Sequence, residues 1–223
     1  MNFIDHLYNI FIDGNGYLLL LNGLGVTLKV AFFACLLGIL LGLVAAIMKL
    51  TEVRKGRKTL FSIIANIIRG TPTVVQLLII YFLVFRSQAS TLAGICTFGI
   101  NSGAYVAEII RAGIMAVDKG QMEAGRSLGL SYGTTMKEII IPQAIKNILP
   151  ALGNELIVLT KETAILGYVG IMDLAKASDF IISRKYVMFE PLIAIAIMYY
   201  IVVKLMTLAL NAFERRLRQS DIR

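Results

Sequence analysis

Charged residues are scarce in this sequence, and tryptophan is absent. Only 16% of the 223 residues are charged, 57% are hydrophobic, and the mean hydropathy is +0.77. A soluble domain of this length carries about 25% charged residues. The shortage of charge indicates that lipid is the solvent for most of the chain. We therefore predict an all-α membrane protein.

Histidine and cysteine are also too few for most catalytic or metal sites. The chain has one histidine, His6, and two cysteines, Cys35 and Cys96, both within apolar segments. Their spacing fits no metal site, and we interpret the cysteines as small buried hydrophobes. The sequence contains no GxxxxGK[ST] loop for nucleotide, and no apolar span carries an aspartate. We therefore expect neither a membrane enzyme nor a bound metal.

The net charge of +8 is distributed at the ends of apolar runs. In a membrane protein such an excess marks cytoplasmic loops rather than a nucleic-acid surface. We expect no nucleic-acid partner.

Five apolar stretches approach or exceed the roughly 20 residues that a helix needs to cross a bilayer. The predicted spans are about 21–48, 59–84, 88–113, 147–170 and 191–213. An amphipathic segment, residues 1–16, precedes them and is expected to lie at the membrane interface. Residues 17–223 are then one transmembrane domain.

The distribution of basic residues predicts the orientation. If the N-terminus is outside, the inner segments 49–60, 117–146 and 214–223 together hold thirteen Lys and Arg, and the outer segments hold four. This bias places the N-terminus outside and the C-terminus in the cytoplasm. Insertion of residues 1–16 or 171–187 into the membrane would change the count of five spans.

Glycine and proline mark three features within the spans. Gly38 and Gly42 form a small-xxx-small pair that suits close helix packing. Pro72, in the sequence Arg-Gly-Thr-Pro at 69–72, predicts an interruption of the second span, because proline lacks a backbone donor. Pro150 is expected in the first turn of the fourth span.

The most polar stretch between spans is 117–146. A short helix is predicted over 121–128, preceded by Gly120, with Gly129 in a left-handed turn after it. Ser131 is the expected N-cap of a second helix over 132–140, and Pro142 restricts what precedes it. Such short helices need a groove to pack in, either in their own bundle or in a partner.

Residues 123–142, EAGRSLGLSYGTTMKEIIIP, resemble the EAA loop of ABC importer membrane subunits. The loop has Glu-Ala-Ala, three residues, Gly, nine residues, Ile, one residue, and Leu-Pro. The positions that match in register are Glu123, Ala124, Gly129, Ile139 and Pro142. Gly125 stands in place of the second Ala, and Ile141 stands in place of Leu.

The resemblance extends over nearly the whole chain. RGTP with Gln76, SGAYVAEIIRAGI at 102–114, IPQAIKNILPALGN and LTKETAILGYVG are similar to the polar amino acid permease branch, which includes histidine, glutamine, arginine and cystine importers. The resemblance implies the type I ABC importer permease fold in the bacterial cytoplasmic membrane. It also implies a second permease subunit (a sister chain or a copy), two cytoplasmic ATPase subunits that hold the ATP and Mg²⁺, and an extracytoplasmic binding protein. The chain itself is expected to bind no cofactor.

The resemblance assigns the polar loop to coupling with the ATPase. The coupling residues it implies are Glu123, Ala124, Gly129, Leu130, Ser131 and Pro142.

The substrate path is predicted from ionisable and polar groups at membrane depth. Glu155 and Glu162 are seven residues apart and share a helix face, so that either carboxylate suits the amino group of an amino acid. Arg69 or Lys161 is expected to balance charge or to meet the α-carboxylate. Pairing of these groups with each other, with a purely structural role, is the alternative. Weaker candidates for the path are Gln76, Ser102 and Glu108; Glu108 can also pair with Arg111, one helical turn away.

Other functions stay open from the sequence. A stand-alone secondary transporter or channel needs no cytoplasmic docking loop, and we see no internal repeat of the kind that such folds often use. A permease of another ABC importer branch, for ions or sugars, is a further alternative, and RGTP and SGAYVAE argue against it only through the resemblance. Which amino acid is carried does not follow from the residues.

Overall fold

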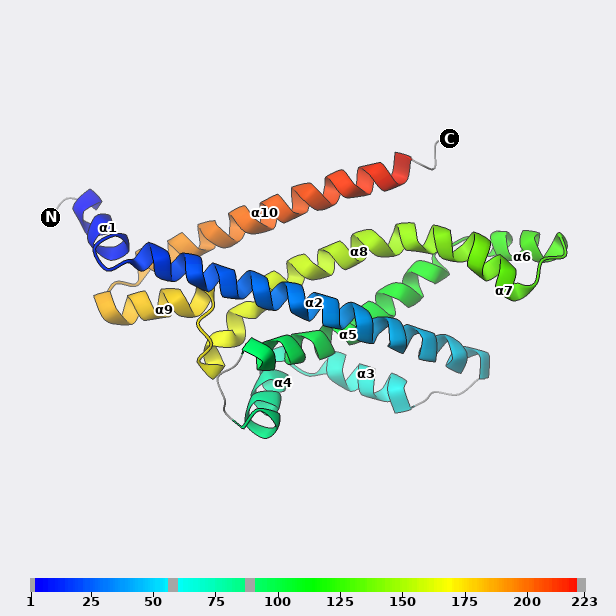
Figure 1. Ribbon diagram of the computed structural model, residues 1–223, viewed down its shortest axis with the longest axis horizontal. Helices are drawn as coiled ribbons and strands as arrows, with labels where there is room; N and C mark the ends of the chain where they lie inside the picture. The colour runs from blue at the N-terminus through cyan, green and yellow to red at the C-terminus, as the bar shows by residue number, and fades with distance from the viewer. Residues whose placement is uncertain (1–2, 56–59, 87–90, 220–223) are drawn as a thin grey trace.

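The structure is a computed structural model that describes residues 3–55, 60–86 and 91–219, and the regular elements in these ranges are helices (Figure 1). Arg57, Lys58 and the predicted start of the third span at residue 88 lie outside the described residues.

The first long helix runs the length of the molecule. A short helix, α1 (Phe3–Phe11), is followed by a turn in which Asn15 has a φ of 52°, and α2 (Gly16–Lys55) then extends from one end of the bundle to the other (Figure 1). The helix is therefore longer at both ends than the predicted span 21–48.

The second predicted span is broken where the sequence indicated. Helix α3 (Leu60–Gly70) stops before Thr71, and α4 (Thr73–Ile79) continues into η1 (Ile80–Val84), a π-helical stretch. The two halves are bent by 107°. The interruption predicted from Pro72 is confirmed.

Helix α5 (Thr91–Met115) packs along α2. A Cβ atom added to Gly38 would lie 2.7 Å from Ser102 Oγ, and one added to Gly42 would lie 2.5 Å from Val106 Cβ. There is no room for a side chain at Gly38 or Gly42, so these two glycines permit the close contact between α2 and α5. This confirms the role predicted for the small-xxx-small pair.

The polar stretch folds into α6 (Lys119–Ser127), α7 (Tyr132–Thr135) and η2 (Met136–Ile140), and leads directly into α8 (Ile141–Glu162). The second helix predicted over 132–140 corresponds to α7 and η2, but the chain stays helical beyond it, and Pro142 lies in the first turn of α8. The preceding residues form a π-helix in which Ile141 N–H donates to Met136 O. This wider turn leaves room for the proline ring, which would meet a carbonyl in an α-helix.

The prediction for Pro150 is wrong. Because α8 begins at Ile141, Pro150 lies in the helix interior rather than in its first turn. Beyond α8 a 3-10 helix, η3 (Thr163–Val169), ends at Gly170 with a φ of 77°.

The connection predicted at 171–187 contains a helix, α9 (Leu174–Lys185), which packs against α2. Leu174 N–H donates to Thr27 Oγ1 at 3.2 Å, and a Cβ atom at Gly23 would lie 2.7 Å from Asp173 O. The final helix, α10 (Phe189–Gln219), returns along the bundle.

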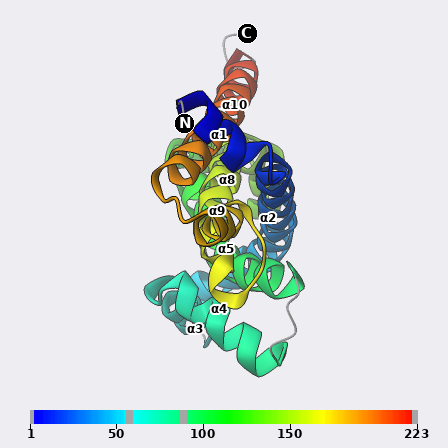
Figure 2. The same cartoon turned by 90° about the vertical axis from the view of Figure 1, so that its left-hand side faces the viewer.

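The main core lies where α2, α4, α5, α8 and η3 meet. Its fully buried members include Val30, Leu77, Phe98, Leu159 and Leu166. Viewed down the long axis, α3 and α4 lie on one side of the bundle and α10 on the opposite side (Figure 2).

Three helices within the described ranges, α2, α5 and α10, are long and apolar enough to cross a membrane, and the bent pair raises the number to four. Helix α8 is not among them although it has 22 residues. Four of its residues are charged, Lys146, Glu155, Lys161 and Glu162, which lowers its apolar character.

Candidate functional site

The segment from α6 to η2, residues 119–140, forms a hook at one end of the molecule (Figure 1). The ends of α2 and α10 point toward the same end, and α1 and α9 lie at the opposite end (Figure 1). The Asp118 carboxylate accepts from Gly120 N–H at 2.6 Å and caps α6. Gly120 is therefore inside the helix rather than before it.

The turn of the hook is closed by backbone hydrogen bonds. Leu130 N–H donates to Gly125 O, and Gly129 N–H donates to Arg126 O, both at 3.1 Å, which is the pattern of a Schellman motif. Gly129 has a φ of 82°, as the left-handed turn predicted for it requires. Ser131 Oγ accepts from Thr134 N–H at 3.1 Å and is the predicted N-cap.

The two arms of the hook touch at Gly125. A Cβ atom at this position would lie 2.5 Å from Thr135 Cγ2, and Thr135 is fully buried. Thr135 Oγ1 in turn donates to Ser131 O at 3.0 Å. Glycine in place of the second alanine of the EAA pattern is thus required by the close approach of Thr135.

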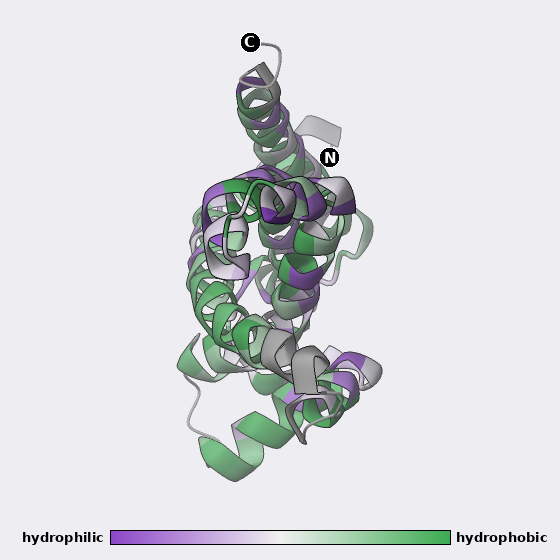
Figure 3. Ribbon diagram, turned by 90° about the vertical axis from the view of Figure 1, so that its right-hand side faces the viewer, coloured by the Kyte–Doolittle hydropathy of each residue, from purple (hydrophilic) through white to green (hydrophobic). Residues whose placement is uncertain are grey.

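The hook has an apolar inner side and an exposed outer side. Met122, Met136 and Ile139 pack on the cluster of Val117, Ile140 and Ala144. On the outside, Leu128 is 81% exposed, and Glu123 and Ala124 are exposed as well. Within the described part of the chain the Glu123 carboxylate has no hydrogen-bond or ion-pair partner. Figure 3, viewed from this end, shows hydrophilic and hydrophobic segments side by side on the hook.

Three consecutive residues of α5 join it to three other helices. Asn101 Nδ2 donates to Gln76 Oε1 on α4 at 3.0 Å, and Ser102 Oγ donates to Glu155 Oε1 on α8 at 2.8 Å. Gly103 lies against Leu41 on α2, where an added Cβ atom would be 3.0 Å from that side chain. This crossing brings together three residues predicted for the substrate path: Gln76, Ser102 and Glu155.

The other predicted residues of the path on α8 lie two turns further along. Glu162 is half-buried at the end of α8, and the neighbouring Lys161 is exposed. With a rise of about 1.5 Å per residue, Glu155 and Glu162 are separated by roughly 10 Å along the helix. They share a helix face but are too far apart for one small group to bridge them.

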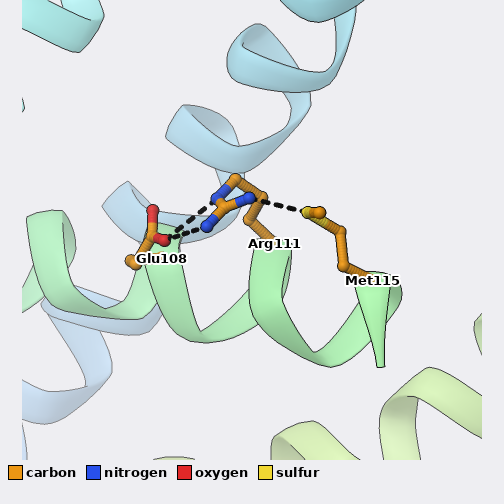
Figure 4. A network of polar contacts seen from close by, with 3 residues as sticks. All are labelled: Glu108, Arg111 and Met115. Atoms are coloured by element: carbon orange, nitrogen blue, oxygen red, sulfur yellow. Dashed lines mark hydrogen bonds and ion pairs between the residues drawn. The ribbon is translucent and has the colours of Figure 1, made fainter. Parts of the chain in front are cut away.

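Arg69 and Glu108 have partners of their own. The Arg69 guanidinium lies over the Tyr105 ring at 5.2 Å from its centroid, a cation–π arrangement. Glu108 forms the predicted ion pair with Arg111, whose Nε donates to Glu108 Oε1 at 3.0 Å and whose Nη1 contacts Met115 Sδ (Figure 4). Sequence reasoning missed the partners Asn101 and Tyr105, since neither position has a distinctive pattern.

A buried carboxylate, Asp173, was also missed. It is fully buried at the N-cap of α9, where it accepts from Lys176 N–H at 2.9 Å and Ala175 N–H at 3.3 Å. Burial raises the pKa of Asp173, the two hydrogen bonds oppose this rise, and the charge of Asp179 adds to it. An aspartate before an apolar helix start is a recognisable cap signal, but its burial depends on α2.

Residues 38–219 match the model of a protein family described as the binding-protein-dependent transport system inner membrane component. The chain is 41% identical to an arginine transport system permease protein, ArtQ, of Bacillus subtilis, over 91% of this chain and 94% of the relative. It is 34% identical to a glutamine transport system permease protein, GlnP, of Escherichia coli, over 90% of this chain and 93% of the relative.

The chain is also similar to solved structures, among them those of two ABC transporters. One, described as an amino acid ABC transporter with histidines, has a TM-score of 0.84 and 44% identity, and the match covers 97% of this chain and 99% of the other. The second, the MetNI methionine ABC transporter in an inward-facing conformation, has a TM-score of 0.75 and 21% identity, covering 89% and 96% of the two chains. At that identity the second match reports on the fold alone.

Proposed function

This chain belongs to the family of inner membrane components of binding-protein-dependent transport systems, and from this premise we propose how it works. It is the permease component of an amino acid ABC importer, a multi-pass inner membrane protein with the type I ABC importer permease fold. Membership of this family decides against a stand-alone transporter or channel. We propose that the substrate is a polar or charged amino acid, as the names of the arginine and glutamine relatives suggest.

We infer that the hook is the surface through which a separate ATPase drives transport. The observation that carries this proposal is that a hydrogen-bonded turn with a packed inner side leaves the side chains of Glu123, Ala124 and Leu128 exposed on its outer side. The Leu130 N–H and the Ser131 hydroxyl make hydrogen bonds within the turn, and Pro142 follows the hook in the first turn of α8. ATP and Mg²⁺ belong to the ATPase, whose closure would move the permease subunits as rigid bodies.

The topology that fits this proposal has five spans with the N-terminus outside. The bent pair α3–α4 supplies the second span, and α8 with η3 supplies the fourth despite its charged residues. The hook then lies in the cytoplasm with the ends of α2 and α10, and α1 and α9 lie at the outer face. Two ATPase subunits, a second permease subunit and an extracytoplasmic binding protein complete the proposed importer.

We propose that Glu162 and Glu155 line the substrate path, with Arg69, Lys161, Gln76, Ser102 and Glu108 near it. Carboxylates at membrane depth are costly and suit the amino group or a basic side chain of an amino acid. The half-buried state of both glutamates leaves part of each carboxylate reachable.

The experiment that tests the coupling surface is Gly129→Asp in the full importer. A side chain at a φ of 82° strains the turn, and the added charge faces the ATPase. We expect uptake to be abolished while the permease stays in the membrane. Gly133→Asp is the matched control, because Gly133 is exposed and its added Cβ meets nothing closer than 3.9 Å. Normal uptake and normal ATPase assembly in Gly129→Asp would contradict the proposal.

The substrate path is tested by comparing variants in which a glutamate is replaced by glutamine with variants in which it is replaced by alanine. Glu155→Gln keeps an acceptor for the Ser102 hydroxyl and removes the charge, whereas Glu155→Ala removes both. If the charge binds substrate, Glu155→Gln and Glu162→Gln raise the KM of uptake while assembly is unchanged. If Glu155 is purely structural, only Glu155→Ala has an effect, and it lowers the amount of assembled importer.

A further inference from the structure

The break between α3 and α4 leaves backbone carbonyls without their helical partners. Pro72 has no N–H, so Ile68 O lacks the donor that lies four residues ahead in an α-helix. Val75 N–H and Gln76 N–H both donate to Pro72 O, which leaves Thr71 O without a helical donor as well. In a membrane-embedded bundle such groups are costly unless a protein donor reaches them.

One side chain reaches both carbonyls. Gln76 Nε2 donates to Ile68 O at 2.6 Å and to Thr71 O at 3.1 Å, and it also contacts Thr71 Oγ1 at 2.7 Å. Thr71 Oγ1 lies 3.1 Å from Ile67 O as a further donor to the end of α3. The carbonyls exposed by the proline are therefore satisfied from within the break.

A second amide fixes the first. Asn101 Nδ2 donates to Gln76 Oε1 at 3.0 Å, and Asn101 is only 4% exposed on α5. This bond orients the Gln76 amide with its nitrogen toward the carbonyls, because a flipped amide would set oxygen against oxygen. The next residue of α5, Ser102, holds Glu155, so the bend is tied to the same turn that carries the proposed path.

We propose that Gln76 and Asn101 are positioning residues that hold the α3–α4 bend against α5 and thereby place Arg69 over the Tyr105 ring. Arg69 is in the last turn of α3, immediately before the break, so its position depends on the angle of the bend. Gln76 then acts on transport through the backbone rather than by touching substrate. The effect on uptake rests on the proposed function, but the effect on the bend does not.

The test measures the bend directly in the reconstituted importer. Spin labels at the exposed residues Ile63 on α3 and Leu83 on η1, with Cys35 and Cys96 replaced by alanine, report the distance across the break. We expect one narrow distance distribution in the otherwise unchanged chain and a broader, shifted one in Gln76→Ala. Gln76→Glu should behave like Gln76→Ala, because glutamate accepts from Asn101 but has no hydrogen for the two carbonyls. Asn66→Ala, an exposed amide on α3, is the matched control and should leave the distribution unchanged.

Uptake by the same variants without labels distinguishes positioning of the bend from direct binding of substrate by Gln76. We expect Gln76→Ala and Gln76→Glu to lower the maximal uptake rate about tenfold or more, as expected of a misplaced group. Reduced uptake with an unchanged distance distribution would overturn the proposal and make Gln76 a substrate ligand. Unchanged distances in both Gln76→Ala and Asn101→Ala would also overturn it.

Asn101→Ala removes only the bond that orients the Gln76 amide and leaves Gln76 itself in place, so it is the variant to measure if Gln76→Ala does not fold. A changed distance with normal uptake would uphold the positioning of the bend and remove its link to transport.

Discussion

Two sharp turns of the described chain, the hook and the α3–α4 bend, are closed by different chemistry. At the hook the backbone itself closes the turn: Gly129 is left-handed and two N–H groups return to carbonyls of α6. At the α3–α4 bend side chains close the break, through Thr71, Gln76 and Asn101.

The difference follows from the surroundings. The hook is mostly exposed, so water satisfies whatever the Schellman motif leaves open. The bend lies between two apolar helices, α3 and α4, and in the proposed membrane span every carbonyl there would need a donor from the protein. A glycine suffices for the exposed turn, whereas the proline break between α3 and α4 is closed by the polar side chains of Thr71 and Gln76, with Asn101 of α5 orienting Gln76.

The largest effect is expected where the arms of the hook touch. Gly125→Ala puts a Cβ atom 2.5 Å from Thr135 Cγ2, an overpacking that costs about 1–3 kcal/mol and tilts α6. We expect uptake to fall strongly while ATP hydrolysis persists, measured as the ratio of the two rates. The double variant Gly125→Ala with Thr135→Ala should recover much of the ratio, because the second change removes the methyl group that clashes. No recovery would show that the contact with Thr135 is not what excludes alanine.

The N-caps of two helices, one buried and one exposed, extend the contrast. Asp173 caps α9 while fully buried, and Ser131 caps α7 while exposed. Asp173→Ala leaves buried N–H groups unpaired and should cost about 2 kcal/mol, whereas Ser131→Ala should cost about 1 kcal/mol or less. Thermal unfolding of the purified importer measures both. Equal shifts of the melting temperature would contradict the importance of burial.

The charge of Asp173 gives the same comparison a pH dependence. Burial raises the pKa of Asp173, so the folded chain holds this proton to a higher pH than the unfolded chain does. The reference is Asp173→Asn, which keeps a cap but does not titrate. The free energy of unfolding of the parent, relative to this variant, should fall as the pH rises through the ordinary aspartate range. It should level off once the pH is above the raised pKa of Asp173. Melting temperatures of the two proteins across this range provide the check, and a difference that is constant with pH would be the contrary result.

A smaller effect is expected at Thr71. Thr71→Val keeps the shape and removes the hydroxyl that lies 3.1 Å from Ile67 O and 2.7 Å from Gln76 Nε2. The loss should be about 1 kcal/mol, because Gln76 still reaches both carbonyls. Thr73→Val, two residues on, is the control. If the melting temperature of Thr71→Val equals that of the parent, the Thr71 hydroxyl does not stabilise the bend, and Gln76 alone satisfies the carbonyls there.

The smallest effect is expected at Arg126. Its Nη1 donates to Leu130 O at 2.9 Å on the exposed side of the hook turn. Because the Schellman bonds and Gly129 already close the turn in contact with water, Arg126→Ala should change stability by less than about 0.5 kcal/mol. Uptake close to that of the parent is expected. A large loss of stability would mean that side chains close this turn too, and the contrast with the bend would disappear.

The sequence by itself determined the features that depend on local chemistry. Gly129, Ser131 and Pro72 specify a left-handed turn, a cap and a break because backbone conformation and missing donors act within a few residues. The scarcity of charge identified a membrane protein, and Gly38 with Gly42 identified a close helix contact, for equally local reasons.

Only the tertiary structure decided the features that join distant segments. Gln76 and Asn101 are 25 residues apart, Ser102 and Glu155 are 53 apart, and Leu174 meets Thr27 across 147 residues. The burial of Asp173 and the requirement for glycine at 125 likewise depend on what another helix presents. Such pairings carry no short-range pattern, because the energy that selects them arises when whole helices pack and not while each one forms.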